Sequence, residues 1–157
     1  MKKLYVVGNK ASKSLSPTIF NYWFKKYNIK ASYGYLELTE KNFHRKIKEV
    51  LEKKDTLGLN VTIPFKNKII KHLGKIDTHA KKIGAVNCVT NKKTINGTNT
   101  DWTGYYKSLP NIKKTKNKKV VILGYGGASH AIHYVLKKRG FKDILIFNRS
   151  KKKIKYS

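Results

Sequence analysis

The sequence predicts an α/β protein in which a mostly parallel sheet flanked by helices is followed by a second, incomplete α/β unit. Strand-like and helix-like hydrophobic patterns alternate over residues 3–109, as they do when helices cover the faces of a sheet. A polar, Lys-rich stretch at residues 110–118 interrupts this alternation. One further strand–helix–strand pattern follows at residues 119–147. We therefore expect two domains, residues 1–109 and residues 110–157.

The elements of the first domain follow from the period of its apolar residues. The predicted strands are residues 3–8, 31–38, 57–63 and 94–99. The predicted helices are residues 16–27, 39–51, 65–73, 77–83 and 101–109. Ser16 should cap the first helix, with Pro17 at its first position, and Thr39 should cap the second. The second helix should bury its apolar residues Phe43, Ile47, Val50 and Leu51. Gly74 should close the third.

The second domain should be a single strand–helix–strand unit at residues 119–123, 128–139 and 143–147. Residues 120–123 and 144–147 are continuously apolar, which is typical of strands that are covered on both faces. A unit of roughly 40 residues is about the smallest that buries enough surface to fold alone. We therefore expect the chain to be truncated within this domain.

The composition indicates a globular protein of a reducing compartment. Apolar residues make up 39% of the 157 residues, and the single cysteine, Cys88, excludes an internal disulfide. No stretch approaches the roughly 20 apolar residues of a membrane span. We therefore expect a cytoplasmic protein without a membrane partner.

The net charge of +28 raises the question of a nucleic-acid partner. The cations are nearly all lysines, since Arg45, Arg139 and Arg149 are the only arginines. Arginine is the residue that base reading and bidentate phosphate contacts favour, and the lysines are spread over the whole chain. We attribute the charge to a compositional bias and expect no nucleic-acid partner.

A glycine-rich loop connects a strand to a helix in the second domain. Residues 124–129 (Gly-Tyr-Gly-Gly-Ala-Ser) stand where such loops bind a dinucleotide pyrophosphate, because glycines admit the anion to the backbone and to the helix N-terminus. The next strand ends in Asn148-Arg149-Ser150, without the acid typical of NAD sites, and an Arg there suits the 2′-phosphate of NADP. A tight turn is the alternative for the glycines, and an ordinary basic residue for Arg149. We predict an incomplete Rossmann-like, NADP-binding domain.

Lys66 stands at the end of a predicted strand of the first domain. Pro64 ends any ladder pairing because it has no backbone N–H, and Lys66 follows where a side chain is held rigidly yet can face a cleft. The alternative is that Lys66 is one lysine among many. Its interpretation as a functional residue depends on the polar groups below.

Two polar clusters of the first domain accompany Lys66. Ser14 and Ser16 lie beside a predicted helix N-terminus, where a carboxylate is favoured, although plain capping by Ser16 explains them equally. Asp101 ends the polar turn 96–101 and is one of the few acids after Asp55, with capping again the alternative. The five histidines show no metal-ligand spacing. We expect no metal site, and we expect His130 and His133 to be surface residues.

Six motifs together resemble the shikimate dehydrogenase family. They are residues 14–17 (Ser-Leu-Ser-Pro), 60–66 (Asn-Val-Thr-Ile-Pro-Phe-Lys), 84–87 (Gly-Ala-Val-Asn), 99–101 (Asn-Thr-Asp), 124–129 and 148–150. The resemblance covers nearly the whole chain. It implies the NADPH-dependent reduction of 3-dehydroshikimate to shikimate, in the route to aromatic amino acids. It also implies that roughly another hundred residues of the family are missing, about one half-domain.

The resemblance also implies roles for individual residues. Ser14 and Ser16 would hold the substrate carboxylate, and Lys66 would be the acid/base. The ring hydroxyls would be bound by Thr62, Asn87 and Asp101. The pyrophosphate would lie on Gly124, Gly126, Gly127 and Ala128, and the ribose phosphate on Asn148, Arg149 and Ser150. The chain departs from the family at Phe20, where His is usual, and at Tyr125, where a small residue is usual.

Lysine chemistry fits this reaction independently of the resemblance. Hydride addition to a ketone leaves an alkoxide, which a charged lysine can protonate, and a nearby carboxylate such as that of Asp101 favours the ammonium form. The alternatives are a quinate/shikimate dehydrogenase, a remnant that binds substrate without catalysis and a basic nucleic-acid-binding module. We expect shikimate or 3-dehydroshikimate as the small-molecule partner, and a monomer or a homodimer.

Overall fold

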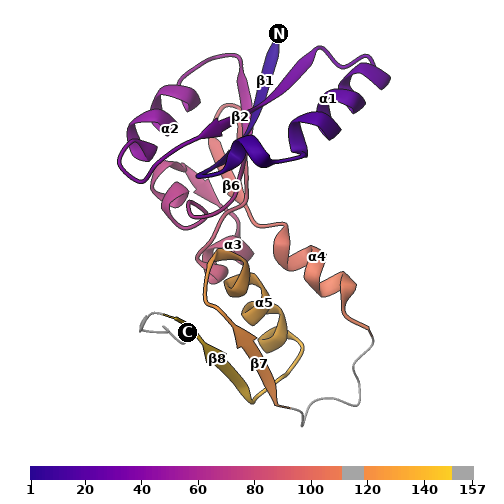
Figure 1. Ribbon diagram of the computed structural model, residues 1–157, viewed down its shortest axis with the longest axis vertical. Helices are drawn as coiled ribbons and strands as arrows, with labels where there is room; N and C mark the ends of the chain where they lie inside the picture. Colours follow the sequence, from indigo (N-terminus) through magenta and orange to yellow (C-terminus); the bar gives the residue numbers. More distant parts are fainter. Residues whose placement is uncertain (111–118, 150–157) are drawn as a thin grey trace. The chain divides into compact units, whose positions relative to one another are not determined.

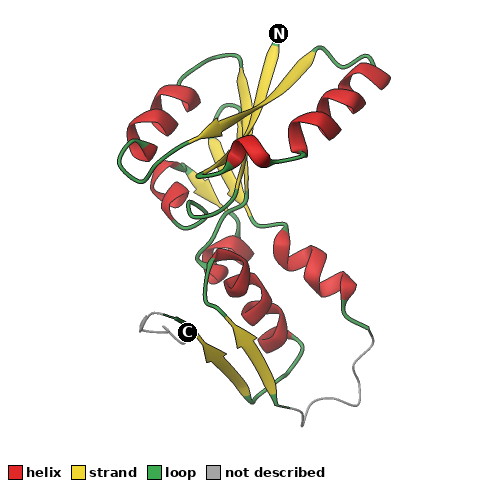
Figure 2. Ribbon diagram, viewed as in Figure 1, coloured by secondary structure: helices red, strands yellow, loops and turns green. Residues whose placement is uncertain are grey.

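The computed structural model describes residues 1–110 and 119–149, which form two compact units, residues 1–100 and 101–157. We expected the first domain to extend to residue 109. In the structure the helix α4 (Asp101–Ser108) packs against the helix α5 (Gly127–Lys138), so α4 belongs to the second unit. Figures 1 and 2 show the elements of each unit.

The first unit is built on a six-stranded sheet with the order β2-β1-β3-β5-β6-β4. The strands are β1 (Lys2–Gly8), β2 (Ala31–Glu37), β3 (Thr56–Val61), β4 (Lys75–Ile76), β5 (Cys88–Asn91) and β6 (Ile95–Thr98). β1 is parallel to both β2 and β3, and β4 is parallel to β6. β5 runs antiparallel to β3 and β6. The mostly parallel sheet is confirmed, whereas β4 and β5 were not predicted.

The helices of the first unit are α1 (Ser16–Lys26), α2 (Phe43–Leu51) and α3 (Thr78–Ile83), with 3-10 turns η1 (Ala11–Lys13) and η2 (Lys68–His72). α2 buries the predicted residues Phe43, Ile47, Val50 and Leu51. Of the predicted helix at 65–73, only the 3-10 turn η2 forms; it ends at His72, and Leu73 rather than Gly74 is its cap residue.

Both predicted caps, Ser16 and Thr39, are wrong. Ser16 is the first residue of α1, and the Oγ of Ser14 accepts the Ser16 N–H instead. At α2 the cap position is Asn42, whose Oδ1 turns back to accept the N–H of Thr39. In both cases the side chain that accepts a backbone N–H is not the one that the sequence pattern indicated.

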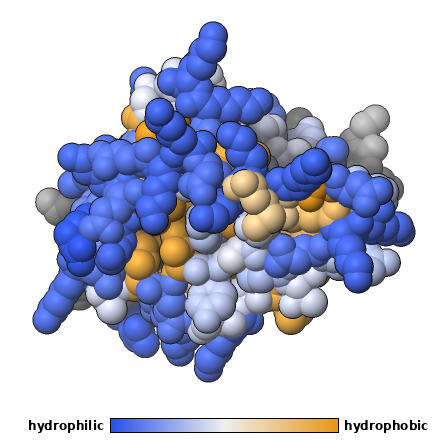
Figure 3. All heavy atoms as spheres, turned by 90° about the horizontal axis from the view of Figure 1, so that it is seen from above, coloured by the Kyte–Doolittle hydropathy of each residue, from blue (hydrophilic) through white to orange (hydrophobic). Residues whose placement is uncertain are grey.

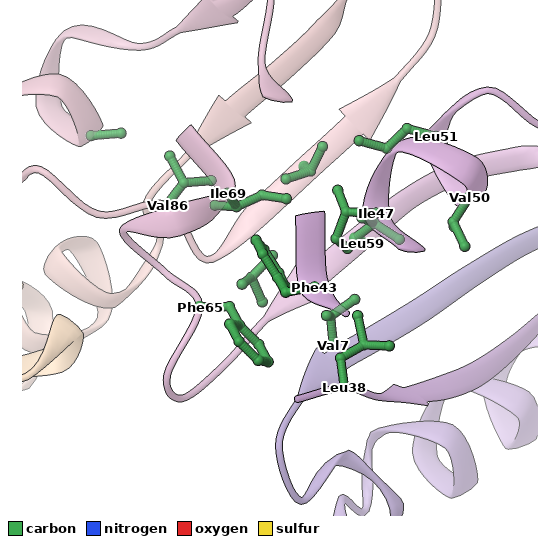
Figure 4. Close-up of a cluster of buried hydrophobic side chains, with 13 residues drawn as sticks. Val7, Leu38, Phe43, Ile47, Val50, Leu51, Leu59, Phe65, Ile69 and Val86 are labelled. Atoms are coloured by element: carbon green, nitrogen blue, oxygen red, sulfur yellow. The ribbon is translucent and has the colours of Figure 1, made fainter. Parts of the chain in front are cut away.

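Buried residues lie on both faces of the sheet of the first unit. The larger cluster lies on the side of α2 and contains Val7, Leu38, Phe43, Ile47, Val50, Leu51, Leu59, Val61, Phe65, Ile69, Ala80, Val86 and Val89 (Figure 4). Within it the rings of Phe43 and Phe65 stack at 4.2 Å. A second cluster of Val6, Ala11 and Tyr33 packs against Phe20 and Phe24 of α1. Since α1 and α2 flank the strands on opposite sides, both faces are closed (Figure 1).

The second unit has a two-stranded parallel sheet of β7 (Val120–Leu123) and β8 (Ile144–Phe147) beside α4 and α5. Its core contains Ile122, Leu136 and Phe141, packed against Tyr105, Val120, Ile132, Ile144 and Ile146. Continuously apolar strands are typical of sheets covered on both faces, and within the described residues only one face of β7 and β8 is covered. Leu123 is 82% exposed and Phe147 is 59% exposed, because every second side chain points away from α5.

Hydrophilic side chains predominate on the face drawn in Figure 3, with hydrophobic atoms showing between them. This agrees with a chain in which lysines are spread along the whole sequence. Among the described residues, none of the helices has the length and apolar character needed to cross a membrane.

Candidate active site

Lys66 is held by the buried residue that precedes it. After β3 ends at Val61, the Thr62 N–H donates to the Val7 carbonyl at 2.8 Å, and the Phe65 N–H donates to the Thr62 carbonyl at 2.9 Å. A Cβ at Gly8 would lie 2.5 Å from the Thr62 Cγ2, so glycine at the end of β1 is what lets Thr62 approach. Phe65 is fully buried against Phe43. The half-buried Lys66 is therefore attached to the core by its neighbour.

Asn87 lies beside Lys66 through backbone pairing. The Val86 N–H donates to the Lys66 carbonyl at 2.8 Å, and the Val61 N–H donates to the Asn87 carbonyl at 2.8 Å. The Asn87 Oδ1 accepts the Thr100 N–H at 2.8 Å, and its Nδ2 donates to the Thr100 Oγ1 at 3.0 Å. These bonds fix the side chain of Asn87 at the end of β3, next to the segment that carries Lys66.

The helix α3 positions residues 84–87, the segment that contains Asn87. Asp77 caps α3, accepting the backbone N–H groups of His79 and Ala80, and Gly84, at φ +71°, ends it in the left-handed conformation. This helix, predicted at 77–83, is confirmed in type and position. The buried Asn99 then donates from Nδ2 to the Ala85 carbonyl at 2.9 Å, which holds residues 84–87 against the end of β6.

The two serines converge at the start of α1. The Ser14 hydroxyl donates to the Ser16 Oγ at 3.1 Å, and both side chains are half-buried. The turn η1 directs them there, since the Ser14 N–H donates to the Ala11 carbonyl at 3.1 Å and Ala11 is buried. The structure therefore brings together the two hydroxyls that the sequence placed beside this helix.

Tyr33 and Asn60 form a hydrogen-bonded pair near the end of β3, and sequence reasoning missed this pair. The Tyr33 hydroxyl donates to the Asn60 Oδ1 at 2.6 Å, and Tyr33 is almost fully buried. Burial raises the pKa of Tyr33 to about 12, while a side-chain hydrogen bond from Ser16 acts in the opposite direction. A tyrosine in a strand is normally a core residue, so nothing in the sequence marked Tyr33.

Asp101 opens the helix α4 and lies in its first turn. It follows Thr100 directly in the chain, but it belongs to the second unit. Its participation in the same site as Lys66 stays a prediction.

The glycine loop of the second unit has the geometry of an anion cradle. Gly124 adopts φ +91°, a conformation that favours glycine, and Gly126 occupies the cap position of α5, with Gly127 as the first helical residue. A Cβ at Gly124 or Gly126 would meet nothing within 4 Å, so the loop backbone is open. Ala128 follows in the first turn of α5. These features fit a pyrophosphate at a helix N-terminus.

The end of β8 lies beside this loop. The Gly124 N–H donates to the Phe147 carbonyl at 2.7 Å, and the Asn148 Oδ1 accepts the Tyr125 N–H at 3.2 Å. Arg149 follows Asn148 and is exposed. Ser150, the last of the predicted phosphate-binding residues, lies outside the described residues.

His130 and His133 are half-buried rather than plain surface residues, which corrects our expectation. The ring of Tyr125 lies 4.4 Å from the His130 ring and 6.3 Å from the His133 ring. Burial lowers the pKa of His133, with smaller contributions from Lys137 and His130. In the two described ranges, no cluster of three or more His, Cys, Asp or Glu side chains could hold a metal ion.

Comparison with known proteins identifies relatives over almost the whole chain. The family model described as the shikimate dehydrogenase substrate binding domain matches residues 6–89. The shikimate dehydrogenase of Thermotoga petrophila is 38% identical over 148 residues, which are 94% of this chain and 55% of that protein. The chain thus spans about half the length of the curated relatives it matches.

Solved structures agree with this match. The crystal structure of the Aquifex aeolicus shikimate dehydrogenase has a TM-score of 0.84 and 37% identity, covering 96% of this chain and 57% of that one. The Thermus thermophilus enzyme, solved in complex with NADP(H) and shikimate, has a TM-score of 0.78 and 28% identity, with coverages of 96% and 57%. This chain belongs to the shikimate dehydrogenase family.

Proposed function

We propose that this chain carries the substrate-binding and catalytic part of an enzyme that reversibly reduces 3-dehydroshikimate to shikimate with NADPH. The observation that carries the proposal is the backbone pairing at the end of β3. Through it Lys66, a proton donor, and Asn87, a hydrogen-bonding amide, are held on adjacent buried segments. Residues 1–109 would bind the substrate, and residues 110–157 would be part of the dinucleotide-binding domain.

Each polar group of the first unit has a role that suits its chemistry. The hydroxyls of Ser14 and Ser16, 3.1 Å apart, would donate to the two oxygens of the substrate carboxylate. Thr62 and Asn87 would hydrogen-bond the ring hydroxyls, together with Asp101. Because Asn87 is tied to Thr100 on both sides of its amide, its orientation is set before the substrate arrives.

Lys66 would be the general acid and base. In the direction of reduction its ammonium group would donate a proton to the alkoxide oxygen that forms on the ring. In the direction of oxidation its neutral amine would accept the proton of the alcohol. Attachment to the buried Phe65 would keep the amine in the geometry that proton transfer requires.

The residues of the second unit fit NADP. The open backbone of Gly124 and Gly126 and the start of α5 would receive the pyrophosphate. Arg149, with Asn148 and Ser150, would contact the 2′-phosphate, and the acid that suits an unphosphorylated ribose is absent. Bound NADPH supplies the hydride. The relative from Thermus thermophilus was solved with NADP(H) and shikimate, which supports this choice.

The test measures substrate binding, which the proposal assigns to the first unit. Shikimate and, as a comparison, quinate are titrated into the 157-residue chain while amide resonances are followed by NMR. We expect saturable shifts with shikimate at residues around Lys66 and Asn87, and weaker binding of quinate. Absence of shikimate binding at millimolar concentrations would overturn the proposal, and tighter binding of quinate would identify a quinate/shikimate enzyme.

A further inference from the structure

His44 and His72 form a pair at the surface of the first unit, although 28 positions separate them in the chain. The His44 Nδ1 lies 2.9 Å from the His72 Nε2. The ring centroids are 5.1 Å apart, and the ring planes are inclined by 28°. His44 is exposed and His72 is half-buried, so water reaches the pair. Spacing along the sequence did not indicate this pair, because it forms only in the folded chain.

Buried neighbours set the positions of both histidines. His44 follows Phe43 in α2, and His72 ends η2, which contains Ile69. Phe43 and Ile69 are fully buried (Figure 4). The Phe43 ring meets the His44 ring edge-on at 5.2 Å and 77°, and the His72 ring at 6.0 Å and 82°. One buried phenylalanine therefore contacts both imidazoles and restricts their movement.

We propose that His44 and His72 bind a divalent transition-metal ion, such as Ni²⁺, Cu²⁺ or Zn²⁺, through their two facing nitrogens. Metal–imidazole bonds of about 2.0–2.1 Å, at an angle of about 90–110°, place the two nitrogens about 2.8–3.4 Å apart. The observed 2.9 Å lies within this range. A rotation of each ring about its Cβ–Cγ bond would point both lone pairs at one ion without a shift of α2 or η2. This inference does not depend on the proposed function.

Metal binding replaces the hydrogen bond that joins the two rings in the free chain. In a pair of neutral imidazoles, one facing nitrogen carries the proton and the other accepts it. That proton moves to the outer nitrogen of the same ring, so that both facing nitrogens donate a lone pair to the ion. No proton is lost overall, and no electron is transferred. Water supplies the remaining ligands, because the described residues contain no cluster of three or more His, Cys, Asp or Glu side chains suited to a metal.

The chemistry of the pair selects the class of metal. Imidazole nitrogen suits Ni²⁺, Cu²⁺ and Zn²⁺, whereas Mg²⁺ and Ca²⁺ require oxygen ligands. The net charge of +28 opposes the approach of any cation. The acid Glu40, which precedes α2, is already paired with Lys68 of η2 at 2.6 Å. Binding therefore depends on the two coordinate bonds rather than on a negative field.

The experiment uses Ni²⁺, which leaves the thiol of Cys88 reduced and broadens the NMR signals of nearby nuclei. The 157-residue chain, prepared without an affinity tag and freed of metal with EDTA, is titrated with nickel chloride at about pH 7.5, where an ordinary imidazole is mostly neutral. We expect saturable broadening of amide signals around His44 and His72. Mg²⁺ at the same concentrations should change nothing.

His44→Asn and His72→Asn each leave one ligand of the pair. The matched control is His79→Asn, because His79 is the third histidine of the first unit and lies on α3. Removal of an outer-shell partner alone costs about 10–100-fold in metal affinity, so loss of a ligand should weaken Ni²⁺ binding at least about tenfold. The control should bind Ni²⁺ as the unaltered chain does. Unchanged affinity in both variants of the pair, an equal loss in the control, or broadening centred on Cys88 would overturn the proposal.

A second measurement uses no variant at either histidine and so does not depend on how those variants fold. Ni²⁺ should raise the urea midpoint of the first unit, read from Trp23 fluorescence in a Trp102→Phe background. The ion binds the folded pair more tightly than the separated histidines of the unfolded chain, which stabilises the folded state by mass action. A midpoint that stayed constant or fell on addition of Ni²⁺ would overturn the proposal.

Discussion

The two units of this chain differ in how their sheets are covered. In the first, Val6 and Val7 are consecutive residues of β1, and each lies in a separate buried cluster. In the second, Ile122 is buried whereas its neighbour Leu123 is 82% exposed. Burial of apolar surface is the main source of stability. The first unit therefore has a core on both sheet faces, whereas the described residues of the second unit leave one sheet face uncovered. The core of the first unit can therefore hold the side chains of a binding site in place before a ligand binds.

The largest expected effect concerns the chemistry assigned to the first unit. Lys66→Ala should lower turnover by about 10²–10⁴-fold, because the proton donor is lost, while shikimate binding changes only a few-fold. The measurement is NADPH formation from shikimate by the chain joined to the part of the Thermotoga petrophila relative that it does not cover.

The matched control for this prediction is Lys71→Ala, an exposed lysine of η2 five positions further along the chain. We expect the control to keep its activity. Comparable turnover in Lys66→Ala and Lys71→Ala would remove Lys66 from the mechanism and leave the first unit as a binding site only.

The comparison predicts that replacing a phenylalanine by alanine lowers the free energy of unfolding much more in the first unit than in the second. Phe43→Ala should destabilise the first unit by about 3–5 kcal/mol, because Phe43 is fully buried and stacks on Phe65. Urea unfolding is followed by Trp23 fluorescence in a Trp102→Phe background, since Trp23 and Trp102 are the only tryptophans and lie in different units.

The control in the second unit is Phe147→Ala, read from Trp102 in a Trp23→Phe background. Phe147 is 59% exposed, so this change should alter the free energy of unfolding by less than about 0.5 kcal/mol. A cost similar to that of Phe43→Ala would contradict the comparison, because it would mean that the outer face of β8 is covered in solution.

The sequence predicted the first unit well where the spacing of apolar residues and the cap residues lie within a single helix. The helix α2 has buried residues at a regular helical spacing, and α3 carries both its cap Asp77 and its terminal Gly84. The short β4 and the antiparallel β5 were missed, because both are defined by pairing with β6 rather than by their own hydrophobic pattern. Local sequence contains no information on such partners.

The residues of the candidate site could be predicted from the sequence, but the hydrogen bonds that connect them could not. Lys66 and Asn87 were found as separate motifs, but the bond between the Val86 N–H and the Lys66 carbonyl depends on tertiary structure. Tyr33 was missed for the same reason, since its partner Asn60 is 27 positions away. In the second unit, the continuous apolar runs at β7 and β8 indicated strands that need cover on both faces, and the described residues cover one.

The uncovered face should make the chain self-associate. Replacing Leu123 and Phe147 by lysine places charge on the exposed side chains of β7 and β8 without touching the buried Ile122. Exposed apolar faces and unpaired strand edges favour association, and charges on them oppose it. We expect sedimentation velocity to show association of the unaltered chain at tens of micromolar and a monomer for the double variant.

The control for association is the pair Tyr22→Lys and Tyr27→Lys, which adds the same charge to exposed aromatic residues around α1 in the first unit. This pair should leave the association unchanged. If the control abolished association and the variants of β7 and β8 did not, the interacting surface would lie on α1, and the contrast between the two units would be wrong.

The smallest expected effect is on the pH dependence of stability, and each unit has its own histidine. Burial lowers the pKa of His72, with a contribution from His44, and burial likewise lowers the pKa of His133, with contributions from Lys137 and His130. A histidine with a lowered pKa in the folded state binds its proton more readily when unfolded. Its stabilising contribution is therefore complete above the unfolded pKa of about 6.5 and is lost as the pH falls below that value.

Urea midpoints read from Trp23 and Trp102 should both fall between about pH 7.5 and pH 5.5, a range that spans the unfolded histidine pKa. His72→Asn should flatten the dependence in the first unit only, and His133→Asn in the second unit only, because the two residues lie in separate units. A midpoint that rose on acidification, or a variant that altered both units alike, would contradict the assignment. The second result would also show that the two units unfold as one, which would remove the basis of the comparison between them.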